Sequence, residues 1–439
     1  MELIDYISLK LVYYRYVGFC ASFWSYVSIK FHVLRGAKRQ FGGSMIAYLD
    51  NAATTKVSES VRDIMVDALY VNFGNPSSMH RKGMEAERYI KDAKESIAKL
   101  LKVEPKEIVF TSGGTESNNM ALIGTALAYQ RSGKHIITTQ FEHASVHNPL
   151  IALEDFGFRI SYVPVDSNGK VIEEALLNEI CEDTILVSIM YVNNEVGAIQ
   201  DIARLSKLVK EKKSDILFHT DAIQCFGKFK IFPKKEGIDL MSVSGHKFHG
   251  PKGAGFLYIK DKVKIKPIIH GGGQQKGYRS GTENVPAIAG LYQAMKEIYE
   301  NHEEKINHLY NLKTHLIEGL QQMPEVTVNA VYTEREDLSL SERVRQTAPH
   351  VVSASFQGIR SEVLLHALED KDIYVSSGSA CASNHPSLSG SLIAIGVDKS
   401  LLDSTLRFSF SVNTKMEEID YTLEVLKEIV PMLRRYTRK

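Results

Sequence analysis

The chain has 439 residues and a formal net charge of +1 at pH 7, so no strong electric field draws it to nucleic acid or to a membrane surface. Hydrophobic residues make up 44% and charged residues 24%, as in a soluble globular protein of two or three domains. Its cysteines, Cys20, Cys181, Cys225 and Cys381, are widely separated. This spacing predicts no metal site and fits a reducing, cytoplasmic compartment.

The first 44 residues differ from the rest of the chain in charge and in aromatic content. They carry six Lys or Arg but two Asp or Glu, and they include the single tryptophan, Trp24. Their longest uncharged run, residues 16–29, is too short to span a membrane, and no clean signal-peptide cleavage site follows it. We expect residues 1–44 to be an extension outside the native protein, which arises from an upstream start codon chosen in error. A targeting segment is the alternative.

From Met45 onward the sequence has the pattern of a folded α/β protein, with helices expected at residues 58–70 and 81–101. Seven short β-like runs then alternate with helical or loop stretches, at residues 108–110, 135–139, 160–165, 184–190, 216–219, 238–243 and 254–259. Several runs are continuously apolar, as expected for strands that are buried on both faces. The alternation predicts a mainly parallel, seven-stranded sheet that is covered by helices.

The part of the chain after this sheet has a different pattern. Helices are expected from about residue 287 to 322, and β-like runs at 351–356, 373–375 and 405–410 then alternate with helices. This pattern is typical of a smaller α+β domain. We therefore expect an N-terminal segment at residues 45–60, a large domain at 61–300 and a small C-terminal domain at 301–439.

A glycine turn after the first β-like run is a candidate anion site. Ligands of mainly parallel sheets bind beyond the carboxyl ends of the strands, where this turn is expected. Gly113 and Gly114 lead into a predicted helix together with Thr115, and a helix that opens in this way offers N–H groups to an anion. The sequence has neither a Walker loop nor a dinucleotide fingerprint, so a single phosphate fits better. An ordinary helix cap is the alternative.

Other chemically distinctive residues follow later runs, namely His143, Asn194, Asp221 with Gln224, and Lys247. A lysine at the end of an apolar strand is desolvated, which favours the neutral amine that attacks carbonyl groups. Each residue alone is usually structural. Pyridoxal phosphate, however, needs an anion site, a flat partner for its ring, a carboxylate for its ring nitrogen and a lysine for an imine. Together the residues predict a pyridoxal phosphate site at one edge of the sheet.

Cys381 stands out among the cysteines because of its neighbours. It lies within residues 376–386, a stretch of small and polar residues, whereas a structural cysteine prefers apolar surroundings. The composition predicts an exposed, reactive thiol on a flexible loop.

The body of the chain resembles the cysteine desulfurases, which are pyridoxal-phosphate enzymes of the class V aminotransferase superfamily with the fold called type I. The extension matches nothing in that family. The matching segments follow one another in the family's order and are residues 48–55, Gly74-Asn75-Pro76-Ser77-Ser78, residues 111–117, Val192-Asn193-Asn194-Glu195, Ser244-Gly245-His246-Lys247, Arg279-Ser280-Gly281-Thr282 and residues 376–381. The segment around Cys381 is similar to that of the subgroup with a long cysteine loop.

The resemblance implies how the cofactor is held. Lys247 would carry it as an imine, His143 would stack on its ring and relay protons, and Asp221 would pair with the ring nitrogen. The phosphate would be held by Gly114, Thr115, Ser244 and His246, joined by Thr282 of the partner subunit in a homodimer.

The resemblance also implies the reaction. Gln224 and Asn194 would contact the ring oxygen or the substrate, and Arg407 would bind the substrate carboxylate. L-cysteine would become L-alanine, with Cys381 accepting the sulfur as a persulfide and passing it to an acceptor protein, either an iron–sulfur scaffold or a tRNA sulfurtransferase. A selenocysteine lyase and a plain aminotransferase are the alternatives, and a catalytically dead binding protein is disfavoured by the complete set of residues.

Overall fold

The computed structural model describes residues 45–377 and 388–437. The expected extension at residues 1–44, with Trp24, therefore lies outside the described residues, and so does Cys381 with most of its loop. The chain divides into two units, residues 1–46 and 47–439, and the second contains all the described helices and strands.

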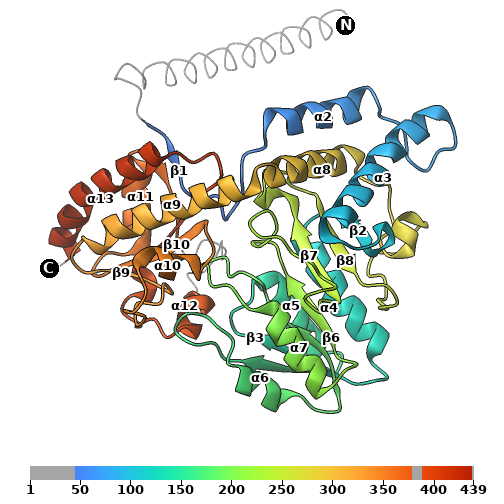
Figure 1. Ribbon diagram of the computed structural model, residues 1–439, viewed down its shortest axis with the longest axis horizontal. Coiled ribbons are helices and arrows are strands. Elements are labelled where there is room, and N and C mark those ends of the chain that lie inside the picture. Colours follow the sequence, from blue (N-terminus) through green and yellow to red (C-terminus); the bar gives the residue numbers. More distant parts are fainter. Residues whose placement is uncertain (1–44, 378–387, 438–439) are drawn as a thin grey trace, which may run out of the picture. The chain divides into compact units, whose positions relative to one another are not determined.

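A seven-stranded sheet is the centre of the first half of this unit, as Figure 1 shows. Its order is β2-β8-β7-β6-β5-β3-β4. Strand β8 runs antiparallel to both of its neighbours, and the other neighbouring pairs are parallel. The prediction of a mainly parallel seven-stranded sheet is therefore confirmed. The strands are β2 (Ile108–Thr111), β3 (His135–Thr139), β4 (Arg159–Val163), β5 (Thr184–Ser188), β6 (Leu217–Asp221), β7 (Leu240–Ser244) and β8 (Gly255–Ile259).

Both faces of this sheet are buried under helices, which explains the continuous apolar runs of its strands. Adjacent residues of one strand enter different hydrophobic clusters: Ile136 packs in one with α4 and α5, and Ile137 packs in the other with α3 and α8. The helices of this part are α2 (Glu59–Tyr70), α3 (Arg81–Leu101), α4 (Gly114–Tyr129), α5 (Ala144–Glu154), α6 (Glu173–Glu179), α7 (Ile202–Lys212) and α8 (Val285–Tyr299).

The C-terminal part has a smaller antiparallel sheet of order β12-β13-β10-β9 and a cluster of apolar side chains of its own. Strand β1 (Ala47–Tyr48) joins this part, because it pairs with β11 (Ile373–Tyr374). The other strands are β9 (Val326–Val328), β10 (Val351–Phe356), β12 (Ser376–Ser377) and β13 (Thr405–Ser409), and the helices are α9 (His302–Gln321), α10 (Leu340–Arg345), α11 (Ser361–Glu369), α12 (Gly390–Ala394) and α13 (Met416–Thr437). The boundaries expected at residues 60 and 300 stay predictions.

Two facts of this architecture position the candidate site. Strands β6 and β7 end side by side at Asp221 and Ser244, so their carboxyl ends bring polar side chains to one edge of the large sheet. The segment after β1 bridges to the small sheet through the pair Asp50 and Ser409. None of the described helices is long and apolar enough to cross a lipid bilayer.

Candidate active site

A cavity of about 410 Å³ opens at the carboxyl edge of the large sheet. Ten of the residues that the sequence singled out line it, namely Gly114, Thr115, His143, Asn194, Asp221, Gln224, Ser244, His246, Lys247 and Arg407. Thr282 does not line this cavity and is exposed. Cys381, the remaining predicted residue, lies outside the described residues. The structure thus brings together the expected groups that come from the large sheet and from β13.

The glycine turn before α4 forms one wall of the cavity. A Cβ atom on Gly114 would lie 2.1 Å from Cδ1 of Ile223, so a larger residue would require the side chain of Ile223 to move away from the turn. The first N–H groups of α4 have no partner within the helix and suit an anion. Thr115, Ser244 and His246 surround this point. Burial, followed by the charge of Lys247, lowers the pKa of His246 to about 4, so its ring is neutral at pH 7.

Asp221 is a buried carboxylate at the end of β6 and is 3% exposed. Its Oδ1 accepts a hydrogen bond from the N–H of Ile223 (2.9 Å), and its Oδ2 accepts one from Nδ2 of Asn118 (2.8 Å). Burial raises the pKa of Asp221, while these hydrogen bonds and the nearby charges of His143 and Lys247 oppose the shift. A cationic partner in the cavity would favour the ionised carboxylate further.

His143 is held in one orientation by its neighbours at the start of α5. Its Nδ1 accepts a hydrogen bond from the N–H of Ser145 (3.1 Å) and lies 2.9 Å from the hydroxyl of the same residue. An Nδ1 that accepts from a main-chain N–H leaves the ring proton of the neutral imidazole on Nε2. The Ser145 hydroxyl also accepts from Asn118, so His143 and Asp221 are linked through two polar side chains.

Lys247 lies in a short 3₁₀ turn that continues β7 into the cavity. Its Nζ donates to the carbonyl oxygens of Ala52 (2.6 Å) and Ala53 (2.9 Å). These carbonyl groups belong to the segment after β1, so the N-terminal strand region holds the amine in the cavity. Residues 48–55, one of the segments that carry the family resemblance, are therefore part of the site.

Arg407 enters the cavity from β13, in the small sheet. Its Nη2 donates to Oδ1 of Asp50 (2.8 Å), and its Nη1 donates to the main-chain oxygen of Asn194 (2.9 Å). Its Nε is buried and has no hydrogen-bond partner among the described residues. The guanidinium is therefore fixed in direction and keeps an unused donor.

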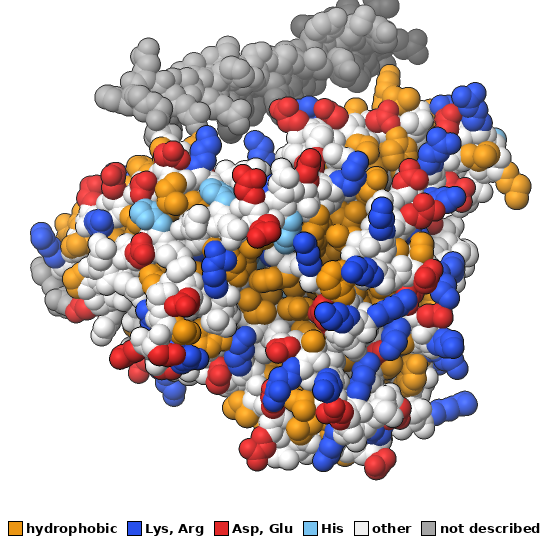
Figure 2. Space-filling view, in the orientation of Figure 1, with side chains coloured by type: hydrophobic (Ala, Val, Ile, Leu, Met, Phe, Trp, Pro, Cys, Tyr) orange, Lys and Arg blue, Asp and Glu red, His pale blue; other side chains and the backbone are white. Residues whose placement is uncertain are grey.

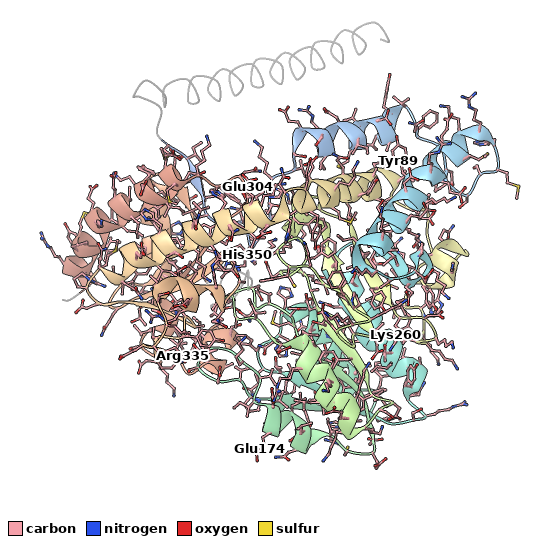
Figure 3. All side chains as sticks on the ribbon, in the orientation of Figure 1. Tyr89, Glu174, Lys260, Glu304, Arg335 and His350 are labelled. Carbon is pink, nitrogen blue, oxygen red and sulfur yellow. The ribbon has the colours of Figure 1, made fainter. Side chains whose placement is uncertain are left out.

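His350, labelled in Figure 3, is a site residue that the sequence did not indicate. It is 1% exposed and precedes β10, and its Nε2 lies 3.0 Å from Oε1 of Gln224. Burial lowers the pKa of His350 well below its usual value, so the ring is neutral and Nε2 donates. Gln224 in turn donates to the carbonyl oxygen of Ala52 (3.0 Å), so both ends of its amide are fixed. The position of His350 before an apolar run did not indicate this contact in the sequence.

Comparison with known proteins agrees with this site. The profile of the family "Aminotransferase class-V" matches residues 47–422. A curated relative, "Cysteine desulfurase IscS" of Methanosarcina thermophila, is 43% identical over 387 residues, which cover 88% of this chain and 92% of the relative. The chain belongs to the cysteine desulfurase family. The resemblance that the motifs gave is thereby confirmed.

Solved structures of the family have the same fold. A "NifS-like protein" superposes with a TM-score of 0.81 at 39% identity, over 89% of this chain and 100% of that one. A structure described as "SspA in complex with cysteine" superposes with a TM-score of 0.69 at 32% identity, over 84% of this chain and 100% of that one. The expected type I fold is thereby confirmed. The role of each site residue stays a prediction.

Glu142, next to His143, is a second buried carboxyl group beside the site of this family member. Its Oε1 accepts hydrogen bonds from Thr139 Oγ1 and from the N–H of Met190 (2.9 Å each), and its buried Oε2 has no partner among the described residues. Burial raises the pKa of Glu142 to about 8, with a smaller contribution from Asp221. The carboxyl group is therefore protonated in the folded chain at neutral pH.

This protonation predicts a pH-dependent effect of Glu142→Gln. The folded pKa lies above the unfolded one, so the wild-type chain loses stability from this group as pH rises from about 4.5 to about 8, at up to about 1.4 kcal/mol per pH unit. An uncharged amide avoids this loss. We expect the gain in stability of the variant, measured as the urea midpoint, to grow from pH 5 to pH 8.

Glu174, which is exposed and labelled in Figure 3, supplies the control for this prediction. Glu174→Gln should change the urea midpoint equally at both pH values. If Glu142→Gln also gives the same change at both pH values, Glu142 is ionised in the folded chain and the prediction is wrong.

Proposed function

We propose that the protein converts L-cysteine to L-alanine with pyridoxal phosphate as cofactor and transfers the sulfur to Cys381. The observation that carries the proposal is the convergence of Lys247, Asp221, His143 and the glycine turn on one cavity that Arg407 also enters. The overall reaction balances: L-cysteine and the Cys381 thiol give L-alanine and a Cys381 persulfide.

The described residues fit pyridoxal phosphate. The turn at Gly114 leaves room for an anion at the start of α4, with Thr115, Ser244 and His246 around it. Asp221 offers a buried carboxylate to a protonated ring nitrogen. Lys247 has an amine in the same cavity, and the Nε2 proton of His143 is free of the contacts that occupy its Nδ1.

The chemistry divides between the cofactor and the chain. When bound, pyridoxal phosphate supplies an electron sink for the charge that forms when the Cα proton of the substrate is removed. The Lys247 amine is the base within reach of the cavity, because Ala52 and Ala53 hold its Nζ there. Asp221 would favour the protonated ring nitrogen, and His143 would present an N–H donor at Nε2.

Arg407 is the group that selects an amino acid by its carboxylate. Among the described residues it is the one arginine that lines the cavity, its side chain is 11% exposed, and Asp50 and Asn194 fix its plane. A guanidinium in such a fork suits a carboxylate better than an ammonium group does. We expect Arg407→Gln to raise KM for L-cysteine about 100-fold with a smaller change in kcat, because a charged hydrogen-bonded pair is lost.

Steady-state kinetics with L-cysteine check this prediction. Arg360→Gln, at an exposed arginine that pairs with Glu362 and Asp403, should leave KM unchanged. A normal KM for Arg407→Gln would assign carboxylate binding to another residue.

Production of alanine from L-cysteine tests the function itself. The full-length chain, loaded with pyridoxal phosphate, should form one alanine for each sulfur that it transfers to a thiol acceptor. A chain that releases selenium from selenocysteine but leaves cysteine intact would favour a selenocysteine lyase. Transfer of the amino group to a 2-oxo acid would favour an aminotransferase.

A homodimer is part of the proposal. Large apolar side chains are exposed on α2 and in the segment that leads into α3, among them Leu69 (62%), Tyr70 (84%), Phe73 (68%) and Met79 (98%). Figure 2 shows apolar side chains at this corner of the face and a further apolar area in its middle, with Lys or Arg and Asp or Glu interspersed around them. Clustered exposed apolar side chains are typical of a contact surface. Thr282 of the partner subunit would then complete the phosphate site, as the family resemblance implies.

The destination of the sulfur follows from the same proposal. We propose that a sulfur-acceptor protein, either an iron–sulfur scaffold or a tRNA sulfurtransferase, takes the persulfide sulfur from Cys381 in the cytoplasm. The mixed charges of the face in Figure 2 fit a protein acceptor better than direct contact with nucleic acid.

A further inference from the structure

Lys228 is a buried lysine directly behind the catalytic lysine. It is 7% exposed, and its Nζ donates to the main-chain oxygen of Lys247 over 2.6 Å. No Asp or Glu among the described residues forms an ion pair with it. A buried ammonium without a paired carboxylate costs folding free energy that an apolar residue of the same size would avoid. A residue with this cost at this position indicates a function beyond packing.

The loop that carries Lys228 is pressed against the turn of Lys247 by two further contacts. The rings of Phe226 and Phe248 pack with their centroids 4.9 Å apart. Gly227 has φ of +84°, and a Cβ atom there would lie 3.0 Å from Cβ of Phe248, so the approach requires glycine. The segment from 226 to 228 therefore fits closely on residues 247 and 248.

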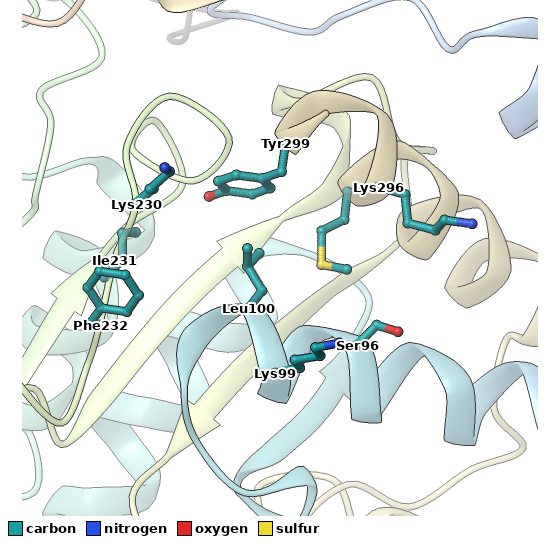
Figure 4. Close-up of a pocket in the computed structure, with 9 residues that line it drawn as sticks. Ser96, Lys99, Leu100, Lys230, Ile231, Phe232, Lys296 and Tyr299 are labelled. Carbon is teal, nitrogen blue, oxygen red and sulfur yellow. The ribbon is translucent and has the colours of Figure 1, made fainter. Parts of the chain in front are cut away.

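Tyr299, at the end of α8, supports the same loop from its other side. Its hydroxyl accepts from the N–H of Gly227 (3.0 Å) and donates to the main-chain oxygen of Phe229 (3.0 Å). Figure 4 shows Tyr299 in the cavity behind the sheet, with its hydroxyl directed toward the segment of Lys230 and Ile231. The loop is therefore held between α8 and the turn of the catalytic lysine.

We propose that Lys228 is a positioning residue for Lys247, which fixes the turn through the carbonyl group of Lys247 and favours the neutral form of its amine by placing a second amine behind it. Asp221, at the end of β6, and Gln224 lie just before this loop in the sequence. One segment therefore positions the carboxylate, the amide and the lysine relative to one another. The inference rests on the proposed function for the role of Lys247, whereas the contacts of Lys228 do not depend on that function.

The charges of Lys228 and Lys247 also affect each other. Burial, and then the charge of Lys247, lowers the pKa of Lys228 to about 7. An interaction of two like charges acts equally on both partners, so a charge on Lys228 lowers the pKa of the Lys247 amine. Four other titratable groups interact electrostatically with Lys228, namely Cys225, His246, His249 and His350. The three histidines are neutral at pH 7 because burial lowers the pKa of each.

The test measures the Lys247 amine directly. The full-length chain, freed of bound aldehyde, is labelled with a trace of acetic anhydride at a series of pH values, and mass spectrometry gives the acetylation of Lys247 at each pH. Lys228→Met removes both the donor and the charge, and Lys228→Gln removes the charge but keeps a donor. We expect both variants to lower the acetylation of Lys247 below about pH 7, where Lys228 still carries charge, and to leave it unchanged above about pH 8, where Lys228 is neutral.

Lys313 provides the matched control. It is equally buried, burial lowers its pKa to about 7, and its Nζ donates to Thr347 Oγ1 (2.6 Å) and to the main-chain oxygen of Ala348 (2.8 Å). Lys313→Met should leave the Lys247 profile unchanged. A wild-type acetylation profile in both Lys228 variants, or an equal change in Lys313→Met, overturns the inference. Lys228→Gln decides the question if Lys228→Met does not fold.

Turnover separates this inference from the proposed function. Lys228→Met should lower kcat for L-cysteine about tenfold with little change in KM, and Lys228→Gln should recover part of that loss through its donor. A purely structural role would lower the thermal midpoint in Lys228→Met and Lys313→Met alike and leave kcat per folded molecule unchanged, which would count against the inference. If the wild-type chain does not turn over cysteine, the proposed function fails, and the shift of the labelling profile still decides the role of Lys228.

Discussion

Lys247→Ala should abolish the conversion of L-cysteine to L-alanine, with a loss of at least about 1,000-fold in kcat, because the proposed function makes the amine both the attachment point for the cofactor and the nearby base. The variant should still fold. It loses two hydrogen bonds, to the carbonyl groups of Ala52 and Ala53, at a cost of about 1–3 kcal/mol. Alanine formation measured by chromatography, together with circular dichroism, checks both statements.

Two controls make the result specific for the amine. Lys247→Arg keeps a positive charge but cannot form an imine, so it should be as inactive as the alanine variant. Lys264→Ala removes an exposed lysine beyond β8 and should retain full activity. Alanine production at the wild-type rate by Lys247→Ala would refute the assignment of the catalytic lysine.

The sheet was predictable because its strands obey a local rule. Strands that are buried on both faces are rich in apolar residues on either face, and the run 254–259 shows this in the sequence alone. The structure ends several strands a residue or two away from the predicted limits. Strand β7 includes Ser244, and β6 includes Asp221, so these polar residues complete their strands where the sequence suggested that they follow them.

The partner of each site residue was less predictable, because it depends on contacts between distant segments. Lys247 is held by Ala52 and Ala53, almost 200 residues earlier, and nothing in the local sequence of those alanines indicates a carbonyl acceptor. His350 contacts Gln224 across 126 residues. Lys228 read alone is an ordinary polar residue after a glycine, and only its burial shows that it lies behind the site. The sequence pattern indicates the chemical groups of the site, and tertiary packing determines which of these groups contact one another.

The electrostatics of the site depend on burial in the same way. The sequence suggested that desolvation acts on Lys247, whereas the structure shows the same effect on a wider set of groups. Burial lowers the pKa of Lys228, His246 and His350 and raises the pKa of Glu142. Of these groups His246 lines the cavity, and the others lie behind its walls, so burial reduces the charge around Asp221 and Arg407.

Cys381→Ser should prevent the transfer of sulfur while leaving the cofactor and the binding of L-cysteine intact. Desulfuration requires a thiol that accepts the sulfur, whereas a hydroxyl group cannot form a persulfide. A serine is nearly the same size as the cysteine that it replaces, so the folded cavity should be unchanged. We expect alanine formation to fall at least about 100-fold, and the adduct of about +32 Da on the intact chain to disappear.

Cys181 and Cys225 provide the comparison that assigns this effect to one thiol. Cys181 is exposed, and its sulfur accepts a hydrogen bond from Arg159 (3.2 Å), while Cys225 is buried. Cys181→Ser should keep both alanine formation and the adduct, because this thiol lies beyond the amino end of β5 and does not line the catalytic cavity. Cys225→Ala should keep them as well. Sulfide release from L-cysteine at the wild-type rate by Cys381→Ser would refute sulfur transfer through Cys381, and loss of cysteine turnover with retained selenocysteine turnover would favour the lyase, because that reaction releases selenium without a thiol acceptor on the enzyme.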